Sequence, residues 1–463
     1  MVLVESEAAS WVRDSGTIEA VRLETRRARM RRRRFDTIAV HGVYDMSEAL
    51  RNQGAILEPV FAGPSQHFAT SEEMAAALAY EVPAWGYSRI ANPTVGYVEE
   101  TLALLESYGS AIEASACMTS SGMSAVHMAT MPFLDVRAGR RMNVVAGAAC
   151  YGGTFMLFSE RYSAERGVDV RWVADPGDMA AWEALIDDET RFVYVETPSN
   201  PTVTVTDVEA LADVAHRHGV PLVVDATIAT PALLRPLALG ADVVVHSVSK
   251  CLAASGAAIA GVLVSRPDIL TRVGSEEMRS DFAKYVKLLP GRDHGPTLSA
   301  ASAFAVLNDL RTLRGRVDQM SRSALKVARF LAGHPAVKAV HYPGLDTHPA
   351  RDVAVRQMRL VDSEAGDGGP ERFGFLLGVE IAGGAAAARR VLDGLELVFR
   401  ATDLGRVKSV ATIPAISTHL QQGSQGRALA DVPANLIRLS VGCEHPDDVI
   451  ADLDHALAYA GAA

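Results

Sequence analysis

The feature that most constrains the fold is an alternation of short apolar segments with helical patterns through the middle of the chain. The helical pattern over residues 206–219 places Val208 and Leu211 on one face. The apolar segments are rich in β-branched residues and lie at residues 142–148, 191–197, 221–227, 242–248 and 258–264. Strands that are apolar on both faces and separated by helices indicate a mostly parallel sheet covered on both sides. We therefore predict an α/β fold for the middle of the chain.

The pattern changes after residue 300. Residues 301–333 predict one or two long helices, with a break near Gly315. Four further apolar segments follow, at residues 337–344, 373–381, 407–413 and 436–442. We expect these segments to form the sheet of a second, smaller α/β domain.

Composition and charge argue against several classes of protein. The 463 residues carry a formal net charge of −10, which disfavours binding of the whole surface to nucleic acid or to an anionic membrane. No uncharged apolar stretch reaches the ~18 residues that a membrane-spanning helix needs. The cysteines lack the spacing of metal ligands, which predicts a reduced cytoplasmic protein without a metal centre; they are Cys117, Cys150, Cys251 and Cys443.

One basic run departs from this acidic average. Residues 26–34 are nearly all arginine. A charge run of this kind is usually a solvated arm or helix face, and the alternative is a contact with a polyanion such as nucleic acid. Because apolar periodicity is weak before residue 35, we expect these residues to precede the folded body.

Reactive side chains follow several of the predicted strands. Asp225 ends one apolar segment, and Lys250 follows the next, flanked by Ser247 and Ser249. In an open α/β sheet, ligands bind at the carboxyl ends of the strands. At such a place a lysine can form an imine with an aldehyde, and a carboxylate can hold a pyridine nitrogen. Hydroxyl groups and the N–H groups of a helix N-terminus suit a phosphate.

Each of these features alone has an ordinary structural reading. Lys250 could be a structural lysine, Asp225 a helix cap, and residues 120–123 the start of a helix. Their occurrence together, in this order, indicates a site for pyridoxal phosphate (PLP).

The segment at residues 436–442 carries an arginine in an apolar setting. Its alternation places Ile437 and Leu439 on one face and Arg438 on the other. An arginine on an apolar strand is either paired within the protein or receives an anion, and the pattern alone leaves both readings open.

Seven motifs, taken in order, resemble the Cys/Met-metabolism family of PLP-dependent enzymes. They are YSRIANPT (87–94), SSGMSAV (120–126), YGGTF (151–155), ETPSNPT (196–202), VVDATIATPALLRPLALGADVVVHSVSK (223–250), STH (417–419) and IRLSVGCEHPDDVIADL (437–453). The resemblance covers about residues 41–460. Members of this family include cystathionine γ-synthase, cystathionine γ-lyase and O-acetylhomoserine sulfhydrylase.

The resemblance implies the fold-type I architecture of PLP-dependent transferases, with a mostly parallel sheet in a large domain and a smaller C-terminal α/β domain. Its implied divisions are an N-terminal arm and inter-subunit segment over residues 1–70, a PLP-binding domain over residues 71–300 and a C-terminal domain over residues 301–463.

The resemblance also implies roles for single residues. Lys250 is similar to the catalytic lysine that bonds to the cofactor, Asp225 to the partner of the pyridine nitrogen, and Tyr151 to a tyrosine that stacks on the ring and transfers protons. The other implied cofactor-binding residues are Gly122, Met123, Ser247, Ser249 and Thr227, with Tyr87 and Arg89 reaching the phosphate of a neighbouring subunit. The residues implied to hold the substrate carboxylate are Arg438, Asn200 and Ser409.

The implied activity is γ-replacement, of the sulfhydrylase or synthase type, on an O-activated homoserine or a similar γ-substituted amino acid through a vinyl intermediate. The alternative is γ-elimination of the cystathionine γ-lyase type, which gives a 2-oxo acid and ammonia. A non-catalytic relative that keeps the fold as a binding protein also stays open. The implied partners are an amino-acid substrate and a thiol or other nucleophile, and the implied assembly is a homotetramer with active sites at dimer interfaces.

The chain departs from the family pattern at several positions on the substrate side. Ala226 replaces the asparagine of the family DNT motif, and residues 403–410 read DLGRVKSV where members have SLGG-ESL. Gly153 stands where methionine γ-lyases carry a cysteine, which argues against that activity. The cofactor anchors are therefore retained while the substrate wall has changed.

Overall fold

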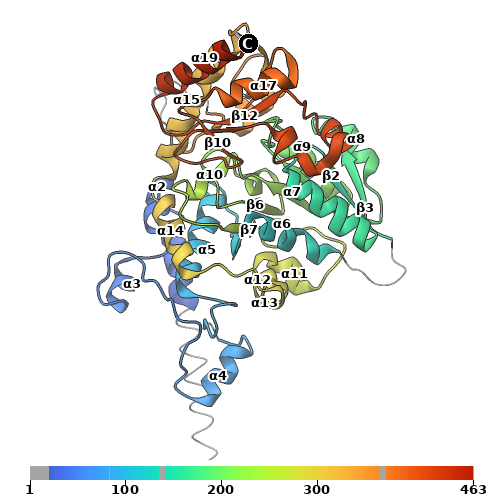
Figure 1. The fold of residues 1–463 in the computed structure, drawn as a ribbon. Helices are drawn as coiled ribbons and strands as arrows, with labels where there is room; N and C mark the ends of the chain where they lie inside the picture. The colour runs from blue at the N-terminus through green and yellow to red at the C-terminus, as the bar shows by residue number, and fades with distance from the viewer. Residues whose placement is uncertain (1–19, 83, 135–140, 364–371, 462–463) are drawn as a thin grey trace, which may run out of the picture.

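The larger of two sheets forms the centre of the molecule (Figure 1). The computed structural model describes residues 20–82, 84–134, 141–363 and 372–461. This sheet has the strand order β1-β7-β6-β5-β4-β2-β3. Its strands are β1 (Ser115–Thr119), β2 (Asn143–Gly147), β3 (Asp169–Val173), β4 (Thr190–Glu196), β5 (Leu222–Asp225), β6 (Val243–His246) and β7 (Gly261–Ser265).

Most strands of the large sheet run in the same direction. The neighbours from β3 through β6 pair in parallel, whereas β7 runs antiparallel to both β6 and β1. The predicted mostly parallel sheet is therefore confirmed, with β7 as the exception. Sequence patterning could not detect this exception because a strand buried on both faces looks the same in either direction.

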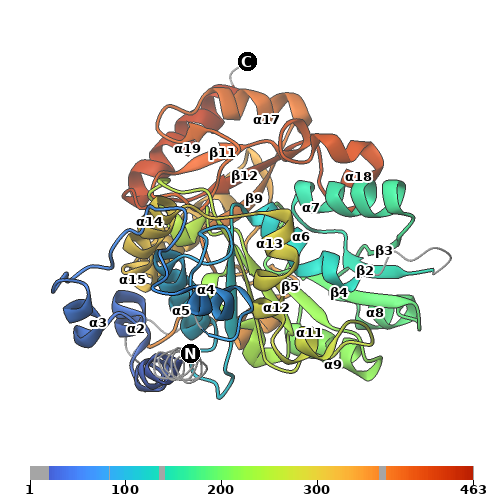
Figure 2. The same cartoon turned by 90° about the horizontal axis from the view of Figure 1, so that it is seen from below.

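The two faces of the large sheet pack against two separate hydrophobic cores. Along β4, Val193 and Val195 belong to one core, and Phe192 and Tyr194 belong to the other. This arrangement follows from the alternation of side chains along a strand. Helices on both sides complete the layers (Figure 2).

The α-helices before residue 300 lie around this sheet and in the segment leading to it. They are α2 (Phe35–His41), α3 (Met46–Arg51), α4 (Ser71–Leu78), α5 (Pro93–Glu106), α6 (Gly122–Thr130), α7 (Gly152–Met156), α8 (Met179–Leu185), α9 (Val208–Arg217), α10 (Thr230–Leu233), α11 (Glu276–Ser280), α12 (Phe282–Leu288) and α13 (Pro290–His294). Helix α6 starts where the predicted cofactor site needs backbone donors, because the Ser121 side chain caps it by accepting from the Ser124 N–H.

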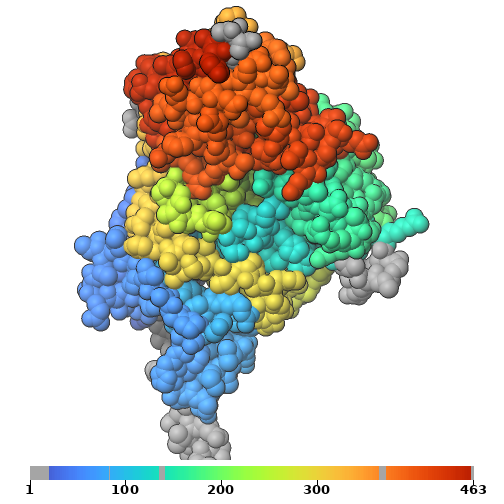
Figure 3. Space-filling view, viewed as in Figure 1, coloured from blue at the N-terminus to red at the C-terminus, as the bar shows by residue number. Residues whose placement is uncertain are grey.

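The smaller sheet lies in the C-terminal part of the chain and has the strand order β10-β11-β12-β9-β8. Its strands are β8 (Val337–His341), β9 (Leu376–Ile381), β10 (Phe399–Arg400), β11 (Val410–Thr412) and β12 (Leu436–Ser440). The α-helices of this part are α14 (Ala300–Leu310), α15 (Leu313–Ala332), α16 (Arg351–Gln357), α17 (Gly384–Asp393), α18 (Gly423–Leu429) and α19 (Pro446–Gly461). In Figure 3 these orange and red residues form one end of the molecule.

The long helical pattern after residue 300 is divided, but not at the predicted place. Helix α14 ends at Leu310 and α15 begins at Leu313, so that Gly315 lies inside the second helix. The break between the helices therefore lies a few residues before the predicted position at Gly315. Glycine is a poor helix former but is tolerated within a helix that tertiary packing holds in place.

The arginine run is packed against the protein rather than preceding it, contrary to the prediction. Residues 20–30 are helical, and Arg26 and Met30 are buried. Arg26 pairs with Glu48, and the Arg27 Nε lies 2.8 Å from the Glu100 carboxylate. Part of the run thus pairs with acidic side chains of this chain, whereas Arg32, Arg33 and Arg34 are exposed. Residues 1–19 lie outside the described part.

The helices give no sign of a membrane span. Within the described ranges, none is both long enough and apolar enough to cross a bilayer.

One glycine on β7, Gly261, lies in close contact with Ser121, the residue that precedes helix α6. A Cβ at Gly261 would lie 2.1 Å from the Ser121 carbonyl oxygen. We expect Gly261→Ala to lower the free energy of unfolding by about 1–3 kcal/mol, because backbone must move to admit the methyl group. Urea denaturation measures this change. The control is Gly315→Ala: nothing lies within 4 Å of the added Cβ, and replacing a glycine inside a helix should add about 0.5–1 kcal/mol. Equal effects of the two changes would contradict the close approach.

Candidate active site

A cavity of about 490 Å³ opens at the carboxyl ends of β4, β5 and β6. The sequence-predicted residues that line it are Gly122, Met123, Tyr151, Asn200, Asp225, Thr227, Ser247, Ser249, Lys250 and Arg438. Ser121 also lines it, and other lining residues, which the sequence reasoning did not select, include Thr154, Glu196, Thr402, Asp403, Arg406 and Thr418. Residues from both halves of the chain therefore meet in one place.

Asp225 is buried at the end of β5 among hydrogen-bond donors. Its Oδ1 accepts from the Thr227 N–H at 3.0 Å and from the Thr227 hydroxyl at 2.6 Å, and its Oδ2 accepts from the Tyr194 hydroxyl at 3.3 Å. Burial raises the pKa of Asp225, while the bonds from Thr227 oppose that rise. A buried carboxylate held in this way is suited to a cationic N–H partner.

Glu196 is a second buried carboxylate that the sequence analysis missed. It ends β4 and lies directly opposite Asp225 in the strand register. Its oxygens accept from the backbone N–H groups of Tyr151 and Asn200, each at 2.7 Å. Burial, and next the neighbouring Asp225, raise the pKa of Glu196 well above its ordinary value. Its place at the end of an apolar strand, like that of Asp225, was the signal that could have identified it.

Lys250 follows β6, and its amine forms an ion pair inside the cavity. The Nζ donates to Asp403 Oδ1 at 2.9 Å, and Arg406 donates its Nε–H to the other oxygen of Asp403. Burial raises the pKa of Asp403, but Lys250 and Arg406 outweigh it, so the pKa lies below its usual range. Asp403 was also missed, although its segment departs from the family pattern.

The start of α6 and the turn after β6 approach each other closely enough to form an anion cradle. A Cβ at Gly122 would lie 2.6 Å from the Ser247 Cβ, so only glycine fits there. The N–H groups of Gly122 and Met123 open the helix, and a helix leaves such groups without an internal partner. The Ser249 hydroxyl is engaged with the backbone of Ala260 on both its donor and acceptor sides.

Arg438 reaches the cavity from β12 in the smaller sheet. Its Nη1 donates to Asn200 Oδ1 at 3.3 Å, and its Nη2 donates to the carbonyls of Thr402 at 2.9 Å and Asp403 at 2.7 Å. Among the described residues no group accepts from its buried Nε. Burial lowers the pKa of Arg438 to about 10. A buried guanidinium that faces a cavity with a spare donor is suited to an anionic ligand.

Three predicted residues lie elsewhere. Tyr87 and Arg89 are absent from the cavity lining, and the Arg89 guanidinium lies 5.6 Å from the centre of the Tyr87 ring. Ser409 is fully buried, and its hydroxyl donates to Glu444 at 2.9 Å instead of facing the cavity. The structure of one chain thus does not bring these residues to the site.

The donors and acceptors around the cavity fit PLP. The cradle at Gly122 and Ser247 offers backbone donors for a phosphate, and the buried Asp225 offers an acceptor for the ring nitrogen. Lys250 supplies the amine for the aldehyde. In the described ranges, no cluster of three His, Cys, Asp or Glu side chains is arranged to hold a metal ion.

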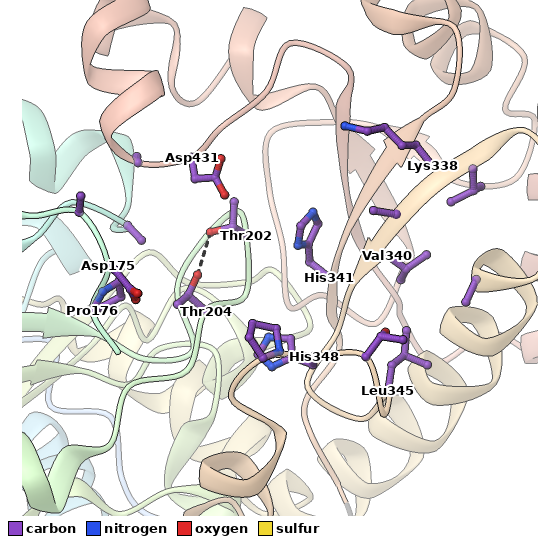
Figure 4. A pocket seen from close by; sticks show the side chains of 18 residues that line it. Asp175, Pro176, Thr202, Thr204, Lys338, Val340, His341, Leu345, His348 and Asp431 are labelled. Carbon is purple, nitrogen blue, oxygen red and sulfur yellow. Dashed lines mark hydrogen bonds between the residues drawn. The ribbon is translucent and has the colours of Figure 1, made fainter. Parts of the chain in front are cut away.

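A larger cavity of about 710 Å³ lies apart from these residues (Figure 4). It is bounded by β8 and by the loop that carries Thr202 and Thr204. His348 lines it and is held by the Val203 carbonyl at 3.2 Å. None of the sequence-predicted residues lines this cavity.

The two buried acids predict a pH dependence of stability. A carboxyl with a raised pKa in the fold stabilises the fold below its unfolded pKa, and that contribution is lost as the pH rises through the folded pKa. Because the pKa of Glu196 is raised, the unfolding free energy of the cofactor-free wild type minus that of Glu196→Gln should fall as the pH rises above the ordinary pKa of a glutamate. Urea titrations of both proteins at several pH values measure this difference in unfolding free energy. The exposed Glu209→Gln is the control; a constant difference for Glu196→Gln would contradict the assignment.

Comparisons with known proteins agree with this geometry. The family described as "Cys/Met metabolism PLP-dependent enzyme" matches residues 36–458. The L-methionine gamma-lyase of Porphyromonas gingivalis is 36% identical over 91% of this chain and 96% of the relative. The O-succinylhomoserine sulfhydrylase of Pseudomonas aeruginosa is also 36% identical, over 92% of this chain and 95% of the relative.

Solved structures show the same fold. The metB protein of Corynebacterium glutamicum superposes with a TM-score of 0.79 at 31% identity, covering 92% of this chain and 98% of that one. A Campylobacter jejuni protein described as an O-acetylhomoserine (thiol)-lyase (metY), which carries N'-pyridoxyl-lysine-5'-monophosphate, superposes with a TM-score of 0.81 at 29% identity, covering 92% of this chain and 100% of that one. The predicted fold class, enzyme class and cofactor are confirmed, and the chain belongs to the Cys/Met metabolism family of PLP-dependent enzymes.

Proposed function

We propose that the protein catalyses γ-replacement on an O-activated homoserine or a similar γ-substituted amino acid. The observation that carries this proposal is the gathering of Lys250, Asp225 and Arg438 around one cavity. These residues provide an amine for the cofactor, a carboxylate for its ring and a cation for the substrate carboxylate. Similarity to the O-succinylhomoserine sulfhydrylases of Pseudomonas aeruginosa and Mycobacterium tuberculosis supports the substrate class.

Each residue has a defined task in this reaction. The bound cofactor supplies an aldehyde that bonds to amines and a ring that withdraws electrons from the substrate α-carbon. Arg438 and Asn200 hold the substrate carboxylate, and the Nζ of Lys250 removes the proton from the α-carbon. Loss of a second proton, from the β-carbon, then lets the γ-group depart; both protons return once the nucleophile has added. The Tyr151 hydroxyl gives a proton to the departing γ-group. A thiol or other nucleophile then takes the γ-position.

Replacement and elimination share the early steps, and overall identity to relatives of the two kinds is equal at 36%. The surroundings of Tyr151 disfavour elimination of the methionine γ-lyase type. A Cβ at Gly153 would lie 2.5 Å from the Tyr151 ring and 3.1 Å from the Met123 sulfur. A side chain here, such as the cysteine expected of a methionine γ-lyase, would require Tyr151 to move. The absence of a side chain at Gly153 thus allows the Tyr151 ring to occupy a position that a cysteine at residue 153 would block.

Product analysis tests the proposed reaction. With an O-acylhomoserine and a thiol, the purified holoenzyme should form the γ-substituted amino acid and the free acid. We expect Lys250→Ala to lower the rate by at least about 10³-fold, because the proton transfers lose their base. Borohydride should add the reduced cofactor to Lys250 in the wild type, as mass spectrometry of the peptide would show. Formation of 2-oxobutyrate and ammonia alone would assign the enzyme to γ-elimination instead.

We also propose that the active site is completed by a second copy of the chain within a homotetramer. Within the described part of the predicted arm and the adjoining segment, the region of α3 and α4 extends from the body, as the blue residues of Figures 1 and 3 show. Large apolar side chains of this region are exposed in the single chain: Met46, Leu50, Ile56, Val60 and Tyr87. Exposed apolar groups in such numbers favour a protein interface. In this proposal Tyr87 and Arg89 meet the phosphate of the partner's cofactor.

Complementation between two inactive variants tests the shared site. Arg89→Ala and Lys250→Ala remove residues that, in a shared site, come from different subunits. In a mixed dimer one site then lacks both residues and the other lacks neither. Co-expression of the two variants should therefore restore activity to roughly a quarter of wild type when subunits mix randomly. Absence of recovery in a purified hetero-oligomer would place both residues in the same site.

The free cysteines support a reducing, cytoplasmic location, which we include in the proposal. Cys117, Cys150 and Cys251 are buried as thiols, and Cys443 is partly buried. Unpaired cysteines are typical of proteins in reducing compartments.

A further inference from the structure

Asp403 brings a carboxylate next to the amine of Lys250, at the position where the chain departs from the family pattern. Its Oδ1 accepts from Lys250 Nζ at 2.9 Å and from the Leu404 N–H at 2.9 Å. Its Oδ2 is held by the Arg406 Nε. Arg406 is in turn anchored, since its Nη1 donates to the Ala253 carbonyl at 2.9 Å. The carboxylate is thus fixed in orientation, with one oxygen directed at the reactive amine.

The same residue lies beside the arginine assigned to the substrate carboxylate. Arg438 Nη2 donates to the backbone carbonyl of Asp403 at 2.7 Å, and both residues line the cavity. A cation with a spare Nε donor and a carboxylate are therefore adjacent on one wall. An amino acid carries its carboxylate and its ammonium on a single carbon. The wall therefore carries charges of both signs, as an amino acid does.

The charges near Asp403 also explain why it stays ionised. Lys250 and Arg406 face its two oxygens, and the pKa of Asp403 lies below its usual range despite partial burial. When the Lys250 amine is bonded to the cofactor, Arg406 still holds one oxygen. The other oxygen, Oδ1, then faces the cavity and can accept from a different amine.

We propose that Asp403 is the counter-ion of whichever amine is not bonded to the cofactor: the ammonium of the arriving amino acid, and then the amine of Lys250 once it is released. Asp403 and Arg438 together select α-amino acids over carboxylic acids of the same shape. Asp403 is a positioning and specificity residue, since it orients the amine toward the reacting carbon. This role concerns the amino-acid substrate of the proposed function, on which it rests.

Binding of two matched probes to the holoenzyme tests this role. L-norvaline has the amino acid charges but no γ-leaving group, and pentanoate is the same chain without the amine. Asp403→Asn keeps the size and one acceptor oxygen but loses the charge. By calorimetry, we expect it to weaken L-norvaline binding by about tenfold to a hundredfold, which is the loss of a hydrogen bond between charged groups. Pentanoate binding should not weaken in Asp403→Asn. Pentanoate has no amine for Asp403 to hold, and the variant removes a negative charge that would repel the pentanoate carboxylate.

Two further variants separate charge from structure. Asp403→Glu keeps the charge and should lose less L-norvaline affinity than Asp403→Asn. Asp393→Asn removes an exposed carboxylate outside the cavity and should change neither affinity. Equal weakening of both probes in Asp403→Asn, or unchanged L-norvaline binding, would overturn the role. Calorimetry measures binding without products, so its result stands whether turnover ends in replacement or in elimination.

Discussion

Two buried carboxylates, side by side at the ends of β4 and β5, are the constraint on which the site depends. Taking Glu196 and Asp225 out of water together costs free energy unless hydrogen-bond donors surround them. The donors that meet this need include the backbone N–H groups of Tyr151 and Asn200 and the hydroxyl of Thr227. Satisfying the acids therefore also fixes the residues that face the cofactor and the substrate.

The active cavity joins two sheets that have different tasks. The large sheet carries the acid for the cofactor ring and the lysine, whereas the smaller sheet carries Arg438 and is close to Asp403. Contacts between the two parts include the pair of Arg438 with Asn200 and the pair of Lys250 with Asp403. The departures from the family pattern at residues 403–410 fall on the substrate side. Specificity can thus change in one sheet while the cofactor anchors in the other are retained.

The sequence was most informative where burial imposes a pattern. Strands buried on both faces were predicted, but the edge strands β1 and β3 of the large sheet and the two-residue β10 were not. Lys250 and Asp225 were predicted because each follows a strand and has a chemical use there. Asp403 was missed because its importance comes from neighbours that only the folded chain supplies, whereas Glu196 ends an apolar strand as Asp225 does and was overlooked. Ser409 was selected by resemblance alone, and its hydroxyl contacts Glu444.

The contact between Gly122 and Ser247 has a consequence for how this protein can change over time. Because the backbone of one residue rests on the side chain of the other, the two positions form a single unit. A larger residue at position 122 would meet the Ser247 Cβ at 2.6 Å and its Cα at 2.9 Å, so even glycine at position 247 would leave too little room. The close approach therefore restricts position 122 to glycine on steric grounds, in addition to any restriction from the chemistry of the cradle.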